Sequence, residues 1–251
     1  MKTQDSQDIG LNKNDHKLEK HPKQDFQVER LAFFSDAVFA IAITLLVIEF
    51  KIPHITGDTR YDDALKQLWD LKYIFFATLL SFVLIARYWS EHHHLFKYIH
   101  NYNNKLIAFN MLVLLPVIFF PFTTAFLAES MNNFISETFN HISGNEKIYL
   151  LGLRLFILNH VIASSAISIF YWYVMVKHRE LSFPMPPKEK INYLTNLWFS
   201  IIFLGILFVI TFLNNLLYLN LVYPGLLLRI IIKRYLKKRY TLEDKNINNS
   251  I

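Results

Sequence analysis

Long apolar runs alternate with short polar links along most of this chain. A helix needs about 20 mostly apolar residues to cross the hydrocarbon core of a bilayer. Six runs approach or exceed this length and predict transmembrane helices. They are Leu31–Phe50, Leu68–Ala86, Leu106–Leu127, Ile148–Val176, Leu194–Leu213 and Leu216–Ile232, the last of which is short and contains Pro224 and Gly225.

The same pattern predicts an all-α integral membrane protein. Residues 30–235 are expected to form the six-helix membrane domain, with polar tails at residues 1–29 and 236–251. The proline-containing segment Ser182–Lys190 is expected to be an extended link between two three-helix halves.

Basic residues lie mostly in alternate links, which predicts the orientation of the spans. With the N-terminus in the cytoplasm, 20 of the 26 Lys and Arg residues fall on the cytoplasmic side and six do not. Both termini are therefore expected in the cytoplasm, in a multi-pass protein of the plasma membrane surrounded by lipid. Because topology accounts for the net charge of +6, we expect no nucleic-acid partner.

Composition narrows the class of function. Hydrophobic residues make up 53% of the chain and charged residues 18%, against roughly 45–50% and 25% in ordinary globular proteins. The absence of cysteine excludes thiolate nucleophiles and thiolate metal ligands. No combination of nucleophile and base appears, so we expect neither an enzyme nor a cofactor.

The first apolar run has a distinct stripe of aliphatic residues. At 100° per residue, Ile41, Leu45 and Ile48 lie within about 60° of one another. Further residues extend or border this stripe, namely Arg30, Phe34, Ala37 and Thr44, whereas Ser35 and Asp36 point away from it. Such a stripe suits helix packing or a lipid-facing surface, and equally a dry pore constriction.

The residues at the start of this run resemble a known signature. Arg30, Phe34, Ser35 and Asp36 reproduce the Arg-x-x-x-Phe-Ser-Asp pattern of the transmembrane protein 175 potassium-channel family. The stretch from Trp89 to Phe96, and the following run with Asn110, are similar to that family as well.

The resemblance implies a prokaryotic single-repeat subunit that assembles as a homotetramer around a pore lined by the first helix. It places the constriction at Ile41, Leu45 and Ile48, with Ala37, Thr44 and Glu49 beside the pore. It gives the signature residues a structural role, in packing and hydrogen bonding. Monovalent cations, and potassium above all, would be the permeant ions.

A hydrophobic constriction is the mechanism that fits this chain. A carbonyl-lined filter needs a glycine-rich loop, and the chain has only six glycines and no Thr-Val-Gly-Tyr-Gly-like run. Glu49, Asp58, Asp62 and Asp63 are candidates for attracting cations to the outer mouth. For Thr44 we expect a hydrogen bond to the carbonyl of Ala40, and for Arg30 a carboxylate partner such as Asp36. The alternative function is a secondary transporter of a small cation or solute.

Three consecutive histidines follow the second span. His92, His93 and His94 splay by 100° per residue, so they cannot all face one metal ion. Trp89 and His93 share a face, which suggests contact with the Ser35 and Asp36 end of the first helix. The sequence leaves open which of the three histidines is used structurally.

Overall fold

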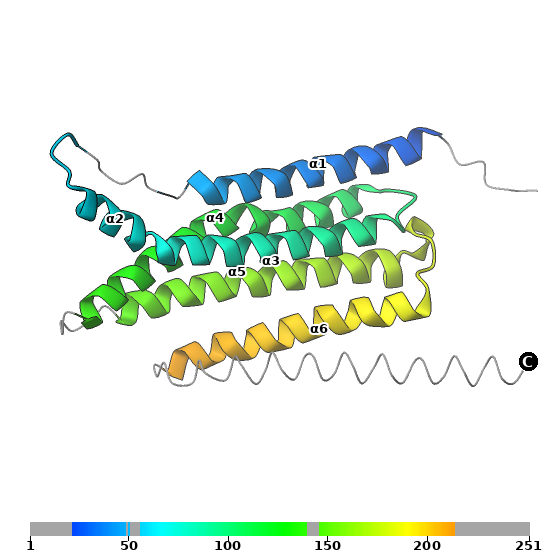
Figure 1. Ribbon diagram of the computed structural model, residues 1–251. Coiled ribbons are helices and arrows are strands. Elements are labelled where there is room, and N and C mark those ends of the chain that lie inside the picture. The colour runs from blue at the N-terminus through cyan, green and yellow to red at the C-terminus, as the bar shows by residue number, and fades with distance from the viewer. Residues whose placement is uncertain (1–21, 49, 51–55, 140–145, 214–251) are drawn as a thin grey trace, which may run out of the picture.

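The computed structural model describes residues 22–48, 50, 56–139 and 146–213, and these residues are helical almost throughout (Figure 1). The long helices are α1 (Pro22–Ile48), α3 (Lys72–Phe96), α4 (Asn104–Phe139), α5 (Glu146–Trp172) and α6 (Pro187–Ile210). Three short helices follow α5 or α6, namely the π-helix η1 (Tyr173–Lys177) and the 3-10 helices η2 (Arg179–Leu181) and η3 (Thr211–Leu213).

Five helices of the described chain are long and apolar enough to cross a membrane. Their outer faces carry many exposed aliphatic and aromatic side chains, which water would disfavour and lipid accommodates. The chain is thus an all-α, multi-pass membrane protein. The predicted sixth span, Leu216–Ile232, and the C-terminal tail lie outside the described residues.

Most predicted spans differ from the observed helices at their ends. α1 begins at Pro22, before the predicted boundary at residue 30, and α6 begins at Pro187, which shortens the predicted extended link. Pro187 suits the first turn of a helix because no intrahelical acceptor is needed there. α4 has 36 residues and a length of about 54 Å, well beyond the bilayer core of about 30 Å. Hydropathy marks only the apolar part of a helix.

The segment before α3 contains a helix that the hydropathy pattern does not predict as separate. α2 (Tyr61–Asp70) is amphipathic and meets α3 at Leu71, so the predicted span that starts at Leu68 is divided there. Asp62 and Asp63 lie in its first turn, where negative charge is favourable next to the positive end of the helix dipole.

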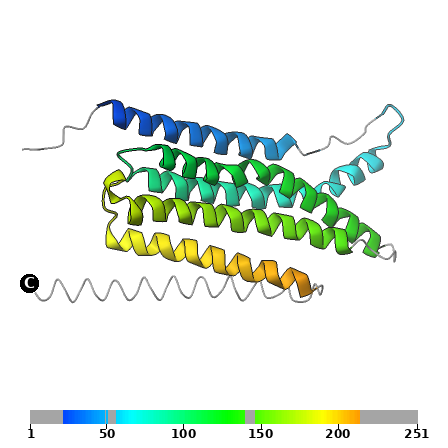
Figure 2. The same cartoon turned by 180° about the vertical axis from the view of Figure 1, so that it is seen from behind.

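The bundle has α1 at one edge and α6 at the opposite edge, with α3, α4 and α5 between them (Figures 1 and 2). α1 packs against α3 and α4, whereas α6 packs mainly against α5. The core between these helices includes Phe39, Ile85, Phe120 and Phe170.

One end of the bundle collects the predicted cytoplasmic links, and we call it the basic end. It holds the first residues of α1, the link 97–103 and the link 178–186 (Figure 1). The two links pair directly: Ile99 and Ser182 form a β-bridge, and the Phe183 amide donates to the Tyr98 carbonyl at 2.7 Å. This pairing joins the α3–α4 connection to the α5–α6 connection.

Candidate functional site

The predicted constriction residues lie together on one face of α1. Ile41, Leu45 and Ile48 are 57%, 37% and 72% exposed. Ala37 and Thr44, on the same side of the helix, are exposed as well. Within the described subunit this face is therefore available to lipid or to another subunit, while Glu49 lies outside the described residues.

The opposite face of α1 holds the helix in the bundle. It is formed by Val28, Ser35, Phe39, Ala42 and Leu46, none of which is more than 6% exposed. The spacing of seven, four, three and four residues places them in one buried row, about 130° from the stripe. α1 is thus anchored along one side only.

Asp36 makes its contact with α3. The indole Nε1 of Trp89 donates to Asp36 Oδ1 at 2.8 Å, and the His93 ring stacks on Trp89 with 5.3 Å between centroids. The structure therefore brings Asp36, Trp89 and His93 together near the middle of α1. The contact lies on the side of α1 away from the aliphatic stripe.

Ser35 belongs to a buried chain of hydrogen bonds. His92 Nε2 lies 2.7 Å from Asn110 Oδ1, Asn110 Nδ2 donates to Ser35 Oγ at 2.8 Å, and Ser35 Oγ donates to the Leu31 carbonyl. With the amide so oriented, the consistent tautomer has the proton on His92 Nε2. Three helices, α1, α3 and α4, are linked through Asn110.

The sequence left open which of the three histidines is used structurally, and the structure shows that His92 faces the interior. His92 is 1% exposed and packs against Phe39, Phe96 and Phe170, whereas His93 is exposed. The signal was present in the spacing of the buried residues of α3, since Ser81, Ile85, Tyr88, His92 and Leu95 repeat at four and three residues.

Two polar contacts expected from the sequence are wrong. Arg30 does not pair with Asp36 and lies instead 5.9 Å from the centre of the Phe26 ring. Asp36 is six residues away from Arg30, on another side of the helix, and accepts a hydrogen bond from Trp89 instead. The Thr44 hydroxyl donates to the carbonyl of Ile41 at 2.8 Å, one residue closer than Ala40. Phe34, also of the signature, is exposed beside Arg30.

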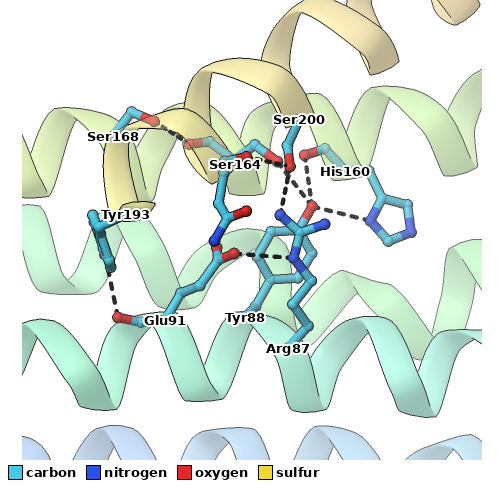
Figure 3. Close-up of polar contacts among 9 residues, drawn as sticks. Arg87, Tyr88, Glu91, His160, Ser164, Ser168, Tyr193 and Ser200 are labelled. Carbon is cyan, nitrogen blue, oxygen red and sulfur yellow. Dashed lines mark hydrogen bonds and ion pairs between the residues drawn. The ribbon is translucent and has the colours of Figure 1, made fainter. Parts of the chain in front are cut away.

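A second polar cluster lies on the other side of α3 (Figure 3). Arg87 Nε and Glu91 Oε1 form an ion pair at 3.0 Å, and Arg87 Nη2 donates to Ser200 Oγ of α6. Tyr193, also of α6, donates to the Glu91 carbonyl at 3.2 Å. The other carboxylate oxygen, Glu91 Oε2, is buried and has no hydrogen-bond partner in the described part of the chain. This cluster ties α6 to α3.

Tyr88 forms a related contact to α5 (Figure 3). Its hydroxyl lies 2.9 Å from Ser164 Oγ and 3.2 Å from His160 Nδ1, and the Tyr88 ring stacks on His160. Both side chains are buried. No group of three or more histidine, aspartate or glutamate side chains suited to a metal ion occurs among the described residues.

Comparison with known proteins finds a family match over most of α1, the whole of α2 and α3, and the first half of α4. The family described as endosomal/lysosomal potassium channel TMEM175 matches residues 30–121. Residues 30–121 of this chain therefore resemble the TMEM175 family. The resemblance predicted from the signature is therefore confirmed, and the TMEM175 family is one of ion channels, not of enzymes.

Two relatives of the TMEM175 region are named potassium channels. The chain is 40% identical over 100 residues to one from Streptomyces collinus, covering 40% of this chain and 47% of that protein. It is 41% identical over 110 residues to one from Chamaesiphon minutus, covering 43% and 52%. In these matches the chain spans about half the length of its curated relatives.

The fold also matches that of a solved TMEM175 homolog over most of the chain. The crystal structure of a lysosomal potassium-selective channel TMEM175 homolog from Chamaesiphon minutus superposes with a TM-score of 0.57 at 23% identity. The match covers 81% of this chain and 98% of that one. At this identity the superposition establishes the helical architecture.

Proposed function

We propose that this chain is the subunit of a passive, potassium-preferring cation channel of the plasma membrane. Four copies would surround a central pore with α1 innermost. The proposal is supported by the potassium-channel relatives of residues 30–121 and by the position of α1 at the edge of the subunit.

The observation that carries this proposal is the contrast between the two faces of α1. The buried row from Val28 to Leu46 fixes the helix, while Ile41, Leu45 and Ile48 of the stripe are exposed in the described subunit. Four such stripes around one axis would form rings of aliphatic side chains. A narrow ring of this kind excludes bulk water and limits the passage of ions.

A dry constriction favours the ion that gives up its water more readily. Potassium holds its hydration shell less tightly than sodium, so the proposed pore prefers potassium modestly. Ala37 and Thr44 would lie beside the constriction, and Asp62 and Asp63 are exposed on α2, which follows α1 along the chain. Negative charge near the outer mouth would favour cations over anions. Glu49 would add to that potential.

Flux measurements in liposomes test the proposal. The purified chain is reconstituted in potassium-loaded liposomes, and the reversal potential is measured under bi-ionic conditions. A channel gives potassium flux that follows the voltage and needs no second substrate. Flux that strictly requires a co-ion, or saturates at carrier-like rates, would establish the alternative, a secondary transporter. Cross-linking of the reconstituted chain should yield a tetramer.

A further inference from the structure

A small, partly open pocket lies at the basic end, where α5 is followed by α6. Its volume is about 220 Å³, and its lining includes Tyr171, Met175, Arg179, Ser182, Met185 and Lys190. These residues come from α5, η1, η2, the following link and the first turn of α6. The pocket is therefore built by four consecutive helices and the link that precedes α6.

Two cations line this pocket, and the acids around it are occupied elsewhere. Arg179 and Lys190 are exposed, and no described carboxylate lies within 4.0 Å of either. Glu91 pairs with Arg87, and Glu180 pairs with His178 at 2.6 Å.

Glu189, next to Lys190, is also engaged. It accepts a hydrogen bond from Tyr98 and lies 3.3 Å from His94 Nε2. The hydrogen bond to this carboxylate raises the pKa of the Tyr98 phenol. The two pocket cations thus remain available to an anion.

A buried hydroxyl adds an independent observation. Tyr171 is 2% exposed, and its hydroxyl is buried without a hydrogen-bond partner among the described residues. A buried polar group in this state costs free energy unless a ligand or water satisfies it. Its ring is fixed by stacking on Tyr193, with 5.1 Å between centroids. Tyr171 lines the pocket together with the two cations, and its hydroxyl has no partner among the described residues.

The surroundings of the pocket are those of a membrane interface. The span that includes α5 ends at Lys177, whose ammonium lies 5.3 Å from the centre of the exposed Trp172 ring. Tryptophan and lysine are frequent at this depth of a membrane. Phe183, a further lining residue, is 45% exposed, so the pocket combines cationic and apolar walls.

We propose that this pocket binds the phosphate of an anionic phospholipid headgroup from the adjacent leaflet. Arg179 and Lys190 contact the phosphate, and the Tyr171 hydroxyl donates to one of its oxygens or to the glycerol. The volume of about 220 Å³ is below the roughly 300–1,000 Å³ of sites for drug-sized ligands, which excludes a nucleotide. Basic pockets between helices at the cytoplasmic side are known to hold such headgroups.

Native mass spectrometry of the full chain in detergent micelles tests this assignment. The probes are dioleoyl phosphatidylglycerol and, as the zwitterionic reference, dioleoyl phosphatidylcholine. We expect the wild type to bind phosphatidylglycerol at least fivefold more tightly. Arg179→Gln and Lys190→Gln should each weaken phosphatidylglycerol binding about fivefold, and Tyr171→Phe about threefold. Equal affinity of the wild type for both lipids would contradict recognition of the anionic headgroup.

Lys97→Gln is the matched control, because Lys97 is an exposed basic residue at the same end that does not line the pocket. It should bind phosphatidylglycerol like the wild type. An equal loss in Lys97→Gln would show diffuse surface attraction and overturn the site. Unchanged binding of phosphatidylglycerol in Arg179→Gln and Lys190→Gln would also overturn the site. Unchanged binding in Tyr171→Phe would show that the Tyr171 hydroxyl is not part of the site.

Inorganic phosphate distinguishes the source of the anion. Addition of phosphate at about 10 mM, enough to nearly saturate a phosphate site with a Kd of about 1 mM, should leave phosphatidylglycerol bound. Complete displacement would identify a site for free phosphate and overturn the lipid assignment. Because the measurement needs no ion flux, its outcome is independent of the proposed channel activity.

Discussion

Trp89 holds Asp36 across the interface between α3 and α1. The indole Nε1 donates to Asp36 Oδ1 at 2.8 Å, so the last third of α3 is joined to the middle of α1. A hydrogen bond to a carboxylate contributes more than one between neutral groups. The acid in the first span thus fixes the helix in place and does not face the proposed pore.

Replacing Trp89 by phenylalanine removes this hydrogen bond while keeping an aromatic ring. We expect Trp89→Phe to lower the free energy of unfolding by about 1 kcal/mol, since the contact is partly exposed. Thermal unfolding in detergent, followed by circular dichroism, measures the change. Trp198→Phe is the control, because Trp198 is 60% exposed on α6. Equal shifts in the two variants would argue against a specific role for the Asp36 contact.

Asn110 connects three helices and should be sensitive to loss of its amide. Asn110→Leu keeps similar volume but leaves His92 Nε2 and Ser35 Oγ with one partner fewer. We expect a loss of about 1–2 kcal/mol, the upper range for hydrogen bonds between membrane helices. A double-mutant cycle with Ser35→Ala should give a coupling energy clearly different from zero. Strict additivity would show that the two contacts act separately.

The Arg87–Glu91 ion pair should depend on both partners. Arg87→Met leaves a carboxylate that is only 13% exposed without its cation, and we expect a loss of about 3 kcal/mol. The double variant Arg87→Met/Glu91→Leu should recover much of that loss, because no uncompensated charge remains. Chemical denaturation in mixed micelles provides the comparison. A double variant as unstable as Arg87→Met would assign the loss to the Ser200 contact.

Gly152 permits the close approach of α5 to α4. A Cβ at this position would lie 2.5 Å from Ser130 Oγ and 3.3 Å from Leu127 Cα. Gly152→Ala should therefore cost about 1–2 kcal/mol through overpacking. Gly205→Ala on α6 meets nothing within 4 Å and should leave stability unchanged or slightly raised. Equal effects of the two substitutions would exclude close packing as the reason.

Polar substitution within the stripe should alter conduction in the proposed channel. Leu45→Asn is expected to wet the constriction and to raise potassium leak at least severalfold in the liposome assay. Val47→Asn is the matched control, since Val47 is 63% exposed but lies about 120° from Ile41. Unchanged flux in Leu45→Asn, in correctly folded protein, would remove Leu45 from the constriction.

The sequence predicted the existence of the described spans better than their contacts. Hydropathy reports the transfer of a segment into lipid, so it located α1 and α3–α6 but placed several helix ends wrongly. α2 was not predicted as a separate helix, because a short amphipathic helix has a low mean hydropathy. Asp62 and Asp63 in its first turn nevertheless suit the start of a helix.

Contacts between helices need information that a single helix does not contain. The i, i+4 spacing of Arg87 and Glu91 could have predicted their pairing, but not that Ser200 would complete it from α6. The spacing of buried residues in α3 could have selected His92, whereas its partner Asn110 becomes evident only from the packing of α4.

The side-chain hydrogen bonds that join α1 to its neighbours occur, among the described residues, at Ser35 and Asp36. Leu45 lies ten residues farther along, about 15 Å away at 1.5 Å per residue. A tilt of about 5° around the tethered region displaces Leu45 by about 1.3 Å, roughly the radius of a water molecule. Because apolar contacts alone hold the distal half of α1, small angular changes near Ser35 translate into lateral shifts at the level of Leu45.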